Sequence, residues 1–335
     1  SVDGESAAGT SSNVNGVLEP GETVELAPSW TNNGSGAASF AGSLTGLAGP
    51  AGASYAIADG SAGYAIAAGA TGSCGGSSSG CYRISVSNPA SRPAAHWDAT
   101  ATEKLSDGSV RKWKVHVGRS FGDVAPSEAF YGAIETLFHS GVTTGCAVAA
   151  YCPNATVARG QIAAFVARAA FGSDAALPTA GFVPGVGAYA CRSGGVSLFG
   201  DVLPSDPFCR QIHWLAAGGR SFSCDEQPSY GSTWCPASPV TRGSFAEILA
   251  RDLSGSDAAV PASLPDPGNG RAYDCTDGQP NAFPDVGDAD PLCRYVYFIW
   301  SRGVIDGFGD GTYRPADTVL RDQMAKFLVN AYALP

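Results

Sequence analysis

Three segments of the chain repeat one another, and this repetition constrains the fold more than any other feature of the sequence. The segments that begin at Phe121 and Phe283 align for about 50 residues without a gap. The middle segment begins at Phe199, carries a short insertion around Gly231 and rejoins the pattern at Pro236. We therefore interpret residues 121–171, 199–253 and 283–332 as three copies of one structural unit.

Each copy has the pattern of two helices joined by a loop. In the first copy, Phe130, Ile134 and Leu137 recur at helical spacing, and a second apolar face begins at Ile162. A unit of two helices cannot bury its own apolar face, so the copies should pack on one another. The prediction for residues 119–335 is therefore a pseudo-symmetric, all-α bundle of three repeats.

An Asp-Val pair stands ahead of the first helix in every copy, at Asp123, Asp201 and Asp285. A carboxylate at this position can accept backbone N–H groups in the turn that leads into the helix. We expect the three aspartates to serve the local fold in this way.

Residues 1–118 have a different pattern, in which short alternating stretches are separated by clusters of Gly, Pro, Asn and Ser. About seven strands of this kind fit an antiparallel β-sandwich, although a small barrel would have a similar sequence. The whole chain is therefore predicted to be an α+β multidomain protein. The clearest expected strands are Val24–Leu26, Ala38–Leu44, Tyr82–Val86, His96–Thr102 and Val110–Val117.

The ten cysteines fall into five local pairs with none left over. Zinc is the competing interpretation, but no Cys-x-x-Cys pair occurs and the four histidines are scattered. Five disulfides indicate an oxidising compartment, and hence an exported protein. The expected pairs are Cys74 with Cys81, Cys146 with Cys152, Cys191 with Cys209, Cys224 with Cys235, and Cys275 with Cys293.

Composition restricts the partners. The formal charge is −10, only 15% of the residues are charged, and no basic run is present, so nucleic acid is not expected as a partner. No apolar run approaches the roughly 20 residues that span a bilayer. The chain starts at Ser1 without a signal peptide, which we interpret as a mature chain or an excised region of a secreted or cell-surface protein.

Residues with catalytic potential do not form a recognisable set. Gly76-Ser77-Ser78-Ser79-Gly80 matches the Gly-x-Ser-x-Gly pattern, but it lies between two cysteines and not in a strand-to-helix turn. His96, His139 and His213 lack a second ligand at helical spacing and are expected to be packed or surface residues. We therefore expect that the protein is not an enzyme.

Two segments could bind calcium. Residues 11–22 follow the rhythm of a twelve-residue calcium loop, with glycine at the sixth place and glutamate at the twelfth. The first ligand would be Ser11, and a strand is expected to follow, so the alternative is an ordinary turn into that strand. Tight turns explain the second segment equally well. The candidate ligands are Asn13, Asn15, Glu19 and Glu22 in the first segment and Asp306 and Asp310 in the second.

The repeat resembles a known family. Its order of Phe-x-Asp-Val, helix, Gly-Val, a Gly-containing loop, Tyr-x-Pro and Val-x-Arg is similar to the S-layer homology repeat. The resemblance implies a three-repeat bundle that often anchors exported proteins to cell-wall polysaccharide. Copies with cysteine, such as that at Gly145-Cys146, resemble a subtype found at the C-termini of secreted bacterial proteases and other surface proteins. Asn15–Glu22 and Arg92–Asp98 resemble the β-domain that often precedes this subtype.

Each copy departs from the family's pattern around one retained arginine. The family's second helix usually opens Thr-Arg-Ala-Glu, in which Thr and Glu form a capping box. Here the arginine is retained in all three copies, the threonine only at Thr241, and the glutamate in none. The arginine could bind a carboxylate or pyruvyl ketal of a glycan, or it could bond to the adjacent repeat. The candidate glycan-binding residues are Arg159, Arg242, Arg321, Asp123, Asp201 and Asp285.

These observations predict a non-catalytic extracellular surface protein. It would attach to the cell envelope, or assemble with itself into a layer, sheath or filament. Its partners would be cell-wall polysaccharide or other copies of the chain, and no cofactor is required apart from the candidate calcium. The alternative is an accessory region of a secreted hydrolase whose catalytic domain is not in this sequence.

Overall fold

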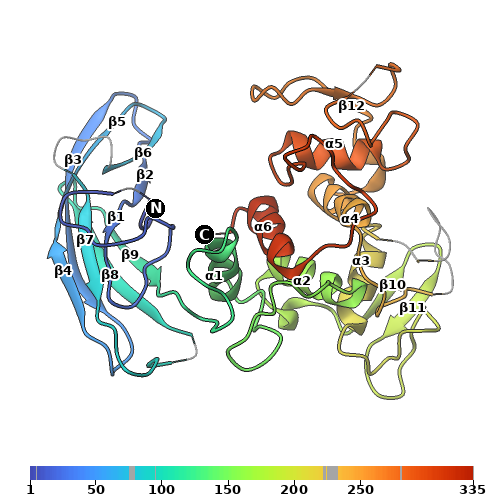
Figure 1. Cartoon of the computed structure of the whole chain (residues 1–335), viewed down its shortest axis with the longest axis horizontal. Coiled ribbons are helices and arrows are strands. Elements are labelled where there is room, and N and C mark those ends of the chain that lie inside the picture. Colours follow the sequence, from blue (N-terminus) through green and yellow to red (C-terminus); the bar gives the residue numbers. More distant parts are fainter. Residues whose placement is uncertain are drawn as a thin grey trace. The chain divides into compact units, whose positions relative to one another are not determined.

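The structure is a computed structural model that describes residues 1–4, 6–74, 80–94, 96–221, 224, 233–279 and 281–334. The chain forms two compact units, Ser1–Glu135 and Thr136–Pro335, whose common limit lies within helix α1 (Tyr131–His139) (Figure 1). Strands and helices are both present, which confirms the α+β class. Among the described helices, none combines the length and apolarity that a membrane crossing requires.

The first unit contains antiparallel sheets. One has the strand order β5-β3-β8-β9, a second has the order β1-β7-β4, and β2 pairs with β6. All five clearest strands of the sequence prediction are present with small shifts at their ends. The bounds are β1 Thr23–Leu26, β2 Ser29–Thr31, β3 Ala38–Ala48, β4 Tyr55–Asp59, β5 Ser61–Ile66, β6 Thr71–Ser73, β7 Tyr82–Val86, β8 Asp98–Leu105 and β9 Val110–His116.

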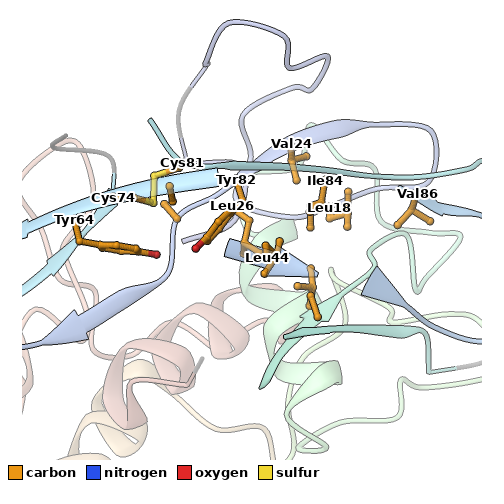
Figure 2. Close-up of a cluster of buried hydrophobic side chains, with 14 of the residues drawn as sticks. Leu18, Val24, Leu26, Leu44, Tyr64, Cys74, Cys81, Tyr82, Ile84 and Val86 are labelled. Atoms are coloured by element: carbon orange, nitrogen blue, oxygen red, sulfur yellow. A yellow bond between two sulfur atoms is a disulfide. The ribbon is translucent and has the colours of Figure 1, made fainter. Parts of the chain in front are cut away.

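Strands of two sheets contribute to one hydrophobic core. In β7, alternate residues Tyr82, Ile84 and Val86 are buried, as the period of two in a strand requires. Figure 2 shows these side chains with Leu44 of β3 and Val24 of β1, so the two sheets share the same cluster. Burial of a side chain of this size stabilises the fold by about 1.5–3 kcal/mol.

A buried carboxylate organises the polar part of this core. Glu103 of β8 is fully buried and accepts hydrogen bonds from both tyrosine hydroxyls and both indole N–H groups around it. Because every donor points at the same side chain, the cost of burying its charge is offset. The donors are Tyr64 (2.5 Å), Tyr82 (2.7 Å), Trp30 (3.0 Å) and Trp113 (2.6 Å).

The second unit consists mainly of paired helices. Helix α2 packs with α3 and α6, and α4 packs with α5. Both α2 and α4 end at a glycine in the left-handed conformation, Gly172 (φ 77°) and Gly255 (φ 86°), which other residues rarely adopt. The bounds are α2 Arg159–Phe171, α3 Cys209–Ala217, α4 Arg242–Ser254, α5 Cys293–Ser301 and α6 Arg321–Tyr332, with short 3-10 helices at Asp174–Ala176 and Asp257–Ala259.

The prediction of an all-α bundle for residues 119–335 was incomplete, because short hairpins lie between the copies. Strand β10 (Ala180–Val183) pairs with β11 (Gly187–Ala190), and β12 (Ser263–Leu264) pairs with β13 (Tyr273–Asp274). These segments are too short and too rich in glycine to have a clear strand pattern in the sequence.

The five predicted disulfides are all present. The two with the longer sequence separation have the same place in the fold, because each joins the region of a hairpin to the first residue of the following helix. Cys191–Cys209 reaches the start of α3 and Cys275–Cys293 the start of α5, with Cα separations of 5.7 and 6.1 Å. The hairpins are thereby fixed to the helical core.

Candidate functional site

The three copies meet in a closed ring of backbone hydrogen bonds. Val157 donates its N–H to the carbonyl of Val319 (3.0 Å), Val319 donates to Val240 (2.9 Å), and Val240 donates back to Val157 (2.9 Å). The three valines hold the same position in their copies and are fully buried or nearly so. Each second helix therefore starts beside a strand-like bond to another copy, and the second unit contains three equivalent junctions.

The retained arginines bridge these junctions. At each one the arginine Nε donates to the backbone carbonyl of an aromatic residue in the next copy, and the guanidinium stacks on that residue's ring. The arginines therefore bond to the adjacent repeat, which is one of the two roles that the sequence left open, and their acceptors are backbone carbonyls. The bonds are Arg159 to Trp234 (2.9 Å), Arg242 to Tyr313 (2.8 Å) and Arg321 to Tyr151 (2.8 Å), with the guanidinium carbon 5.0, 4.7 and 4.8 Å from the ring centroid.

The three arginines differ in exposure. Arg242 and Arg321 are only 3% and 4% exposed, whereas Arg159 is half-buried. Burial lowers the pKa of Arg159, an effect that Glu247 and Asp201 oppose, since both carboxylates favour the charged guanidinium. The junction between the first and second copies is therefore the one of the three at which solvent reaches the arginine.

Two aspartates of the Asp-Val pairs, Asp201 and Asp285, have other partners than we predicted. Asp201 accepts the backbone N–H groups of Trp234 (2.8 Å) and Cys235 (2.7 Å), more than 30 residues along the chain and not in the adjacent turn. Asp285 accepts the equivalent N–H groups of Tyr313 (2.8 Å) and Arg314 (2.6 Å). Their carboxylates fix the segment whose aromatic carbonyl receives the arginine. Asp123, the third of the set, lies in the first unit.

Each carboxylate also stabilises an unusual backbone conformation. Cys235 (φ 57°) and Arg314 (φ 58°) are left-handed although neither is glycine. Cys152 (φ 59°) has the same conformation at the same position of the first copy. A left-handed residue costs about 1–3 kcal/mol and persists only where its surroundings fix it, as the two carboxylate bonds do for Cys235 and Arg314.

In two of the three copies a glutamine side chain caps the start of the second helix. The side-chain oxygen of Gln161 accepts the backbone N–H of Ala158 (3.1 Å), and Gln323 accepts that of Leu320 (3.3 Å). In the middle copy Thr241 supplies the other half of the box by accepting the N–H of Ser244 (3.2 Å). The capping function of the family's motif is thus partly retained with different residues.

A further charged cluster, which sequence reasoning missed, joins the second and third copies. Asp257 accepts Tyr295 Oη (2.6 Å), Arg251 Nε (2.8 Å) and Arg294 Nη2 (2.8 Å). A smaller version occurs one copy earlier, where Arg168 binds Asp174 through Nε (3.0 Å) and Nη2 (2.7 Å). The arginine and the aspartate are separated by six residues in both places. This repeated spacing is the sequence pattern from which the cluster could have been predicted.

This cluster predicts a loss of stability in acid. Burial alone would raise the pKa of Asp257, but the hydrogen bonds from Tyr295 and Arg251 and the nearby charges lower it to about 2. The pKa of an aspartate in the unfolded chain is about 3.9. The stabilisation that ionised Asp257 contributes is therefore complete above about pH 4 and is lost as the pH falls towards 2. The difference in melting temperature between wild type and Asp257→Asn should be constant from pH 5 to 8 and shrink below pH 4. A difference that stays constant down to pH 2 would contradict this.

His139 and His213 are buried, whereas His96 is exposed. His213 is fully buried; it accepts the backbone N–H of Leu198 through Nε2 (3.1 Å), so its Nδ1 donates to the carbonyl of Cys209 (2.8 Å). Burial lowers its pKa and keeps it neutral. His96 Nε2 and His116 Nδ1 both contact Asp98, at 2.9 and 2.6 Å. Residues 76–79 of the Gly-x-Ser-x-Gly pattern lie outside the described part of the chain.

The two candidate calcium segments differ. Asp306 and Asp310 each pair with an arginine, Arg271 (2.8 Å) and Arg314 (2.7 Å), so the protein itself supplies cations to both carboxylates. Hydrogen bonds from Thr312 and Arg314 hold the pKa of Asp310 well below its usual range. In the first segment the structure brings Asn13, Asn15, Glu19 and Glu22 together without such a cation.

Comparison with known proteins gives a family match at the third copy. No curated protein matches the chain. A family model described as the S-layer homology domain matches residues 282–325, which contain Asp285, helix α5 and the first turn of α6 with Arg321. Residues 282–325 are therefore an S-layer homology domain, the type of domain that binds cell-wall polysaccharide and attaches proteins to the cell surface.

Proposed function

We propose that this chain is a non-catalytic surface protein whose second unit attaches it to the cell envelope by binding wall polysaccharide. The observation that carries the proposal is the ring of three equivalent junctions, to two of which the matched S-layer homology domain contributes, through Tyr313 and Arg321. The aspartate contacts occur in both the second and the third copies, and the arginine contacts occur in all three. These shared contacts support the proposal that the first two copies are also similar to the S-layer homology domain matched at residues 282–325.

The ligand would bind at the junction of the first and second copies. Arg242 and Arg321 are buried against carbonyls and rings, so they hold the copies together. Arg159 is the arginine that solvent reaches, and it lies over the ring of Trp234. A planar guanidinium suits an acidic sugar, because its N–H fork binds a carboxylate. Trp234 is only 1% exposed, so its ring supports the guanidinium from below and does not contact the sugar.

Co-sedimentation with purified sacculi tests this. The chain should pellet with sacculi that retain their polysaccharide and stay in solution with sacculi stripped by hydrofluoric acid. Arg159→Gln should weaken pelleting about tenfold, because a hydrogen bond to a charged group contributes about 1.5–3 kcal/mol. Arg192→Gln is the matched control, since Arg192 is exposed and takes part in none of the three junction bonds. Equal pelleting with stripped sacculi would refute the proposal.

A second candidate, self-assembly, is favoured by one observation. Four of the eight large apolar side chains that are exposed in the described residues lie between positions 182 and 203. Phe182 and Leu203 are the most exposed of the four, at 63% and 66%. Apolar side chains that are exposed close together in the sequence make this segment the candidate contact surface. Ordered polymers in negative-stain images without wall material, lost in a Phe182→Ser/Leu203→Ser variant, would support assembly over attachment.

A further inference from the structure

A buried cluster of carboxylates lies near the N-terminus of the first unit. Asp3 and Glu19 are 0% and 1% exposed, and Glu22 is half-buried. Glu22 accepts the backbone N–H of Glu19 (3.0 Å), and its carboxyl group lies within hydrogen-bond reach of the Glu19 side chain. Among the described residues no lysine, arginine or histidine forms an ion pair with any of the three. Three acidic groups are therefore gathered in one place without a basic partner.

Asp3 reaches the cluster because the N-terminal segment pairs with β1. The N–H of Asp3 donates to the carbonyl of Glu25 (3.0 Å), and the carbonyl of Asp3 accepts the N–H of Gly16 (3.2 Å). Its Oδ2 accepts the N–H of Asn15 (2.9 Å). The Asp3 side chain therefore lies against residues 15–22 although it is remote from them in sequence.

One oxygen of this side chain has no partner. Oδ1 of Asp3 is buried and accepts no hydrogen bond. The contrast with Glu103 is informative, because that equally buried carboxylate is surrounded by four donors. A buried carboxylate oxygen without a donor is costly, and in proteins such oxygens pair with a cation or coordinate a metal.

The neighbours of Glu19 add further oxygen ligands. Asn13 and Asn15 each donate their amide nitrogen to one carboxylate oxygen of Glu19, both at 2.7 Å. Asn13 is exposed, so its amide can rotate and present oxygen in place of nitrogen. Burial raises the pKa of Glu22 to about 7; the backbone N–H of Glu19 opposes this rise, and the Glu19 and Asp3 side chains add to it.

We propose that Asp3, Glu19 and Glu22, with the amide oxygen of Asn13, bind one calcium ion. Calcium takes six to eight oxygen ligands in flexible geometry, which suits carboxylates from two separate segments. Zinc favours tetrahedral sites with nitrogen or sulfur ligands, and magnesium needs a stricter octahedron. The proposal keeps Glu19 and Glu22 from the predicted loop and replaces the expected first ligand, Ser11, by Asp3. It does not rest on envelope attachment.

Titration of the full chain tests the site. After treatment with EGTA and dialysis, isothermal titration with calcium chloride should show one ion per chain, and 1 mM calcium should raise the melting temperature of the first unit by about 5 °C. Magnesium at the same concentration should give less than a fifth of this shift. No heat and no shift, or an equal shift with magnesium, would overturn the proposal.

Isosteric variants separate binding from folding. Asp3→Asn and Glu22→Gln remove charge but keep volume, so in EGTA both should melt at or above the wild-type temperature, because repulsion is relieved. Neither should gain stability from calcium. Asp310→Asn is the matched control, since Asp310 already pairs with Arg314, and it should keep the full shift. Retained calcium binding in both first-unit variants, or its loss in the control, would place the ion elsewhere.

Discussion

Replacement of Arg242 by alanine is expected to lower the free energy of unfolding of the second unit by about 4 kcal/mol. The guanidinium donates to the carbonyls of Tyr313 (2.8 Å) and Asp306 (3.0 Å) and stacks on Phe308, so alanine leaves buried acceptors without donors and a cavity. Arg242→Lys keeps the charge but cannot reproduce the planar fork, and we expect about half the loss. Urea unfolding followed by circular dichroism at 222 nm measures both effects.

The control for this substitution is Arg192→Ala. Arg192 is exposed in the same unit, and its removal should change the free energy of unfolding by less than about 0.5 kcal/mol. An Arg242→Ala protein that unfolds like wild type but no longer pellets with sacculi would show that Arg242 binds ligand and does not hold the junction.

Removal of the Cys275–Cys293 disulfide should have the second-largest effect, about 3 kcal/mol. The bond closes a loop with a sequence separation of 18, and such a loop restricts the unfolded chain strongly. The double substitution to serine avoids a free thiol, and chemical denaturation of the purified variant measures the change.

The matched comparison is the double serine variant of Cys146 and Cys152. That bond has a sequence separation of only 6, and its loss should cost about 2 kcal/mol on the same chain-entropy argument. Equal losses for the two pairs would mean that loop length does not set the stabilisation, and that native contacts around each bond do.

The repeats made part of the helical unit predictable. Because residues 283–332 match residues 121–171 in register, one helix pattern predicted the others, and the six described helices lie where that pattern places them. The disulfides were predictable from local spacing for the same reason. The short strands Ser29–Thr31 and Thr71–Ser73 were not, since three residues cannot establish a periodicity. The finer arrangement, a β-sandwich followed by the bundle, stays a prediction.

The partners of the arginines could not be predicted from the sequence. Arg321 bonds to the carbonyl of Tyr151, 170 residues away, and every residue carries a carbonyl, so no side chain marks the acceptor. Asp3 was missed for a related reason. Pairing of the N-terminal segment with β1 places it beside Glu22, and only the register of that pairing reveals the contact.

The triangle of valine bonds has a consequence for how such a protein can change in length. Val319 of the third copy bonds to Val240 of the second, and Val157 of the first copy bonds to Val319. The three copies therefore form a closed ring in space, in which no copy has an unpaired end at these bonds. An open solenoid tolerates added or deleted repeats at its ends, whereas a closed ring does not. The N–H and carbonyl groups of the three valines are all paired, so a fourth copy would have to break one of these bonds to enter the ring, and a deletion would expose two junction surfaces at once.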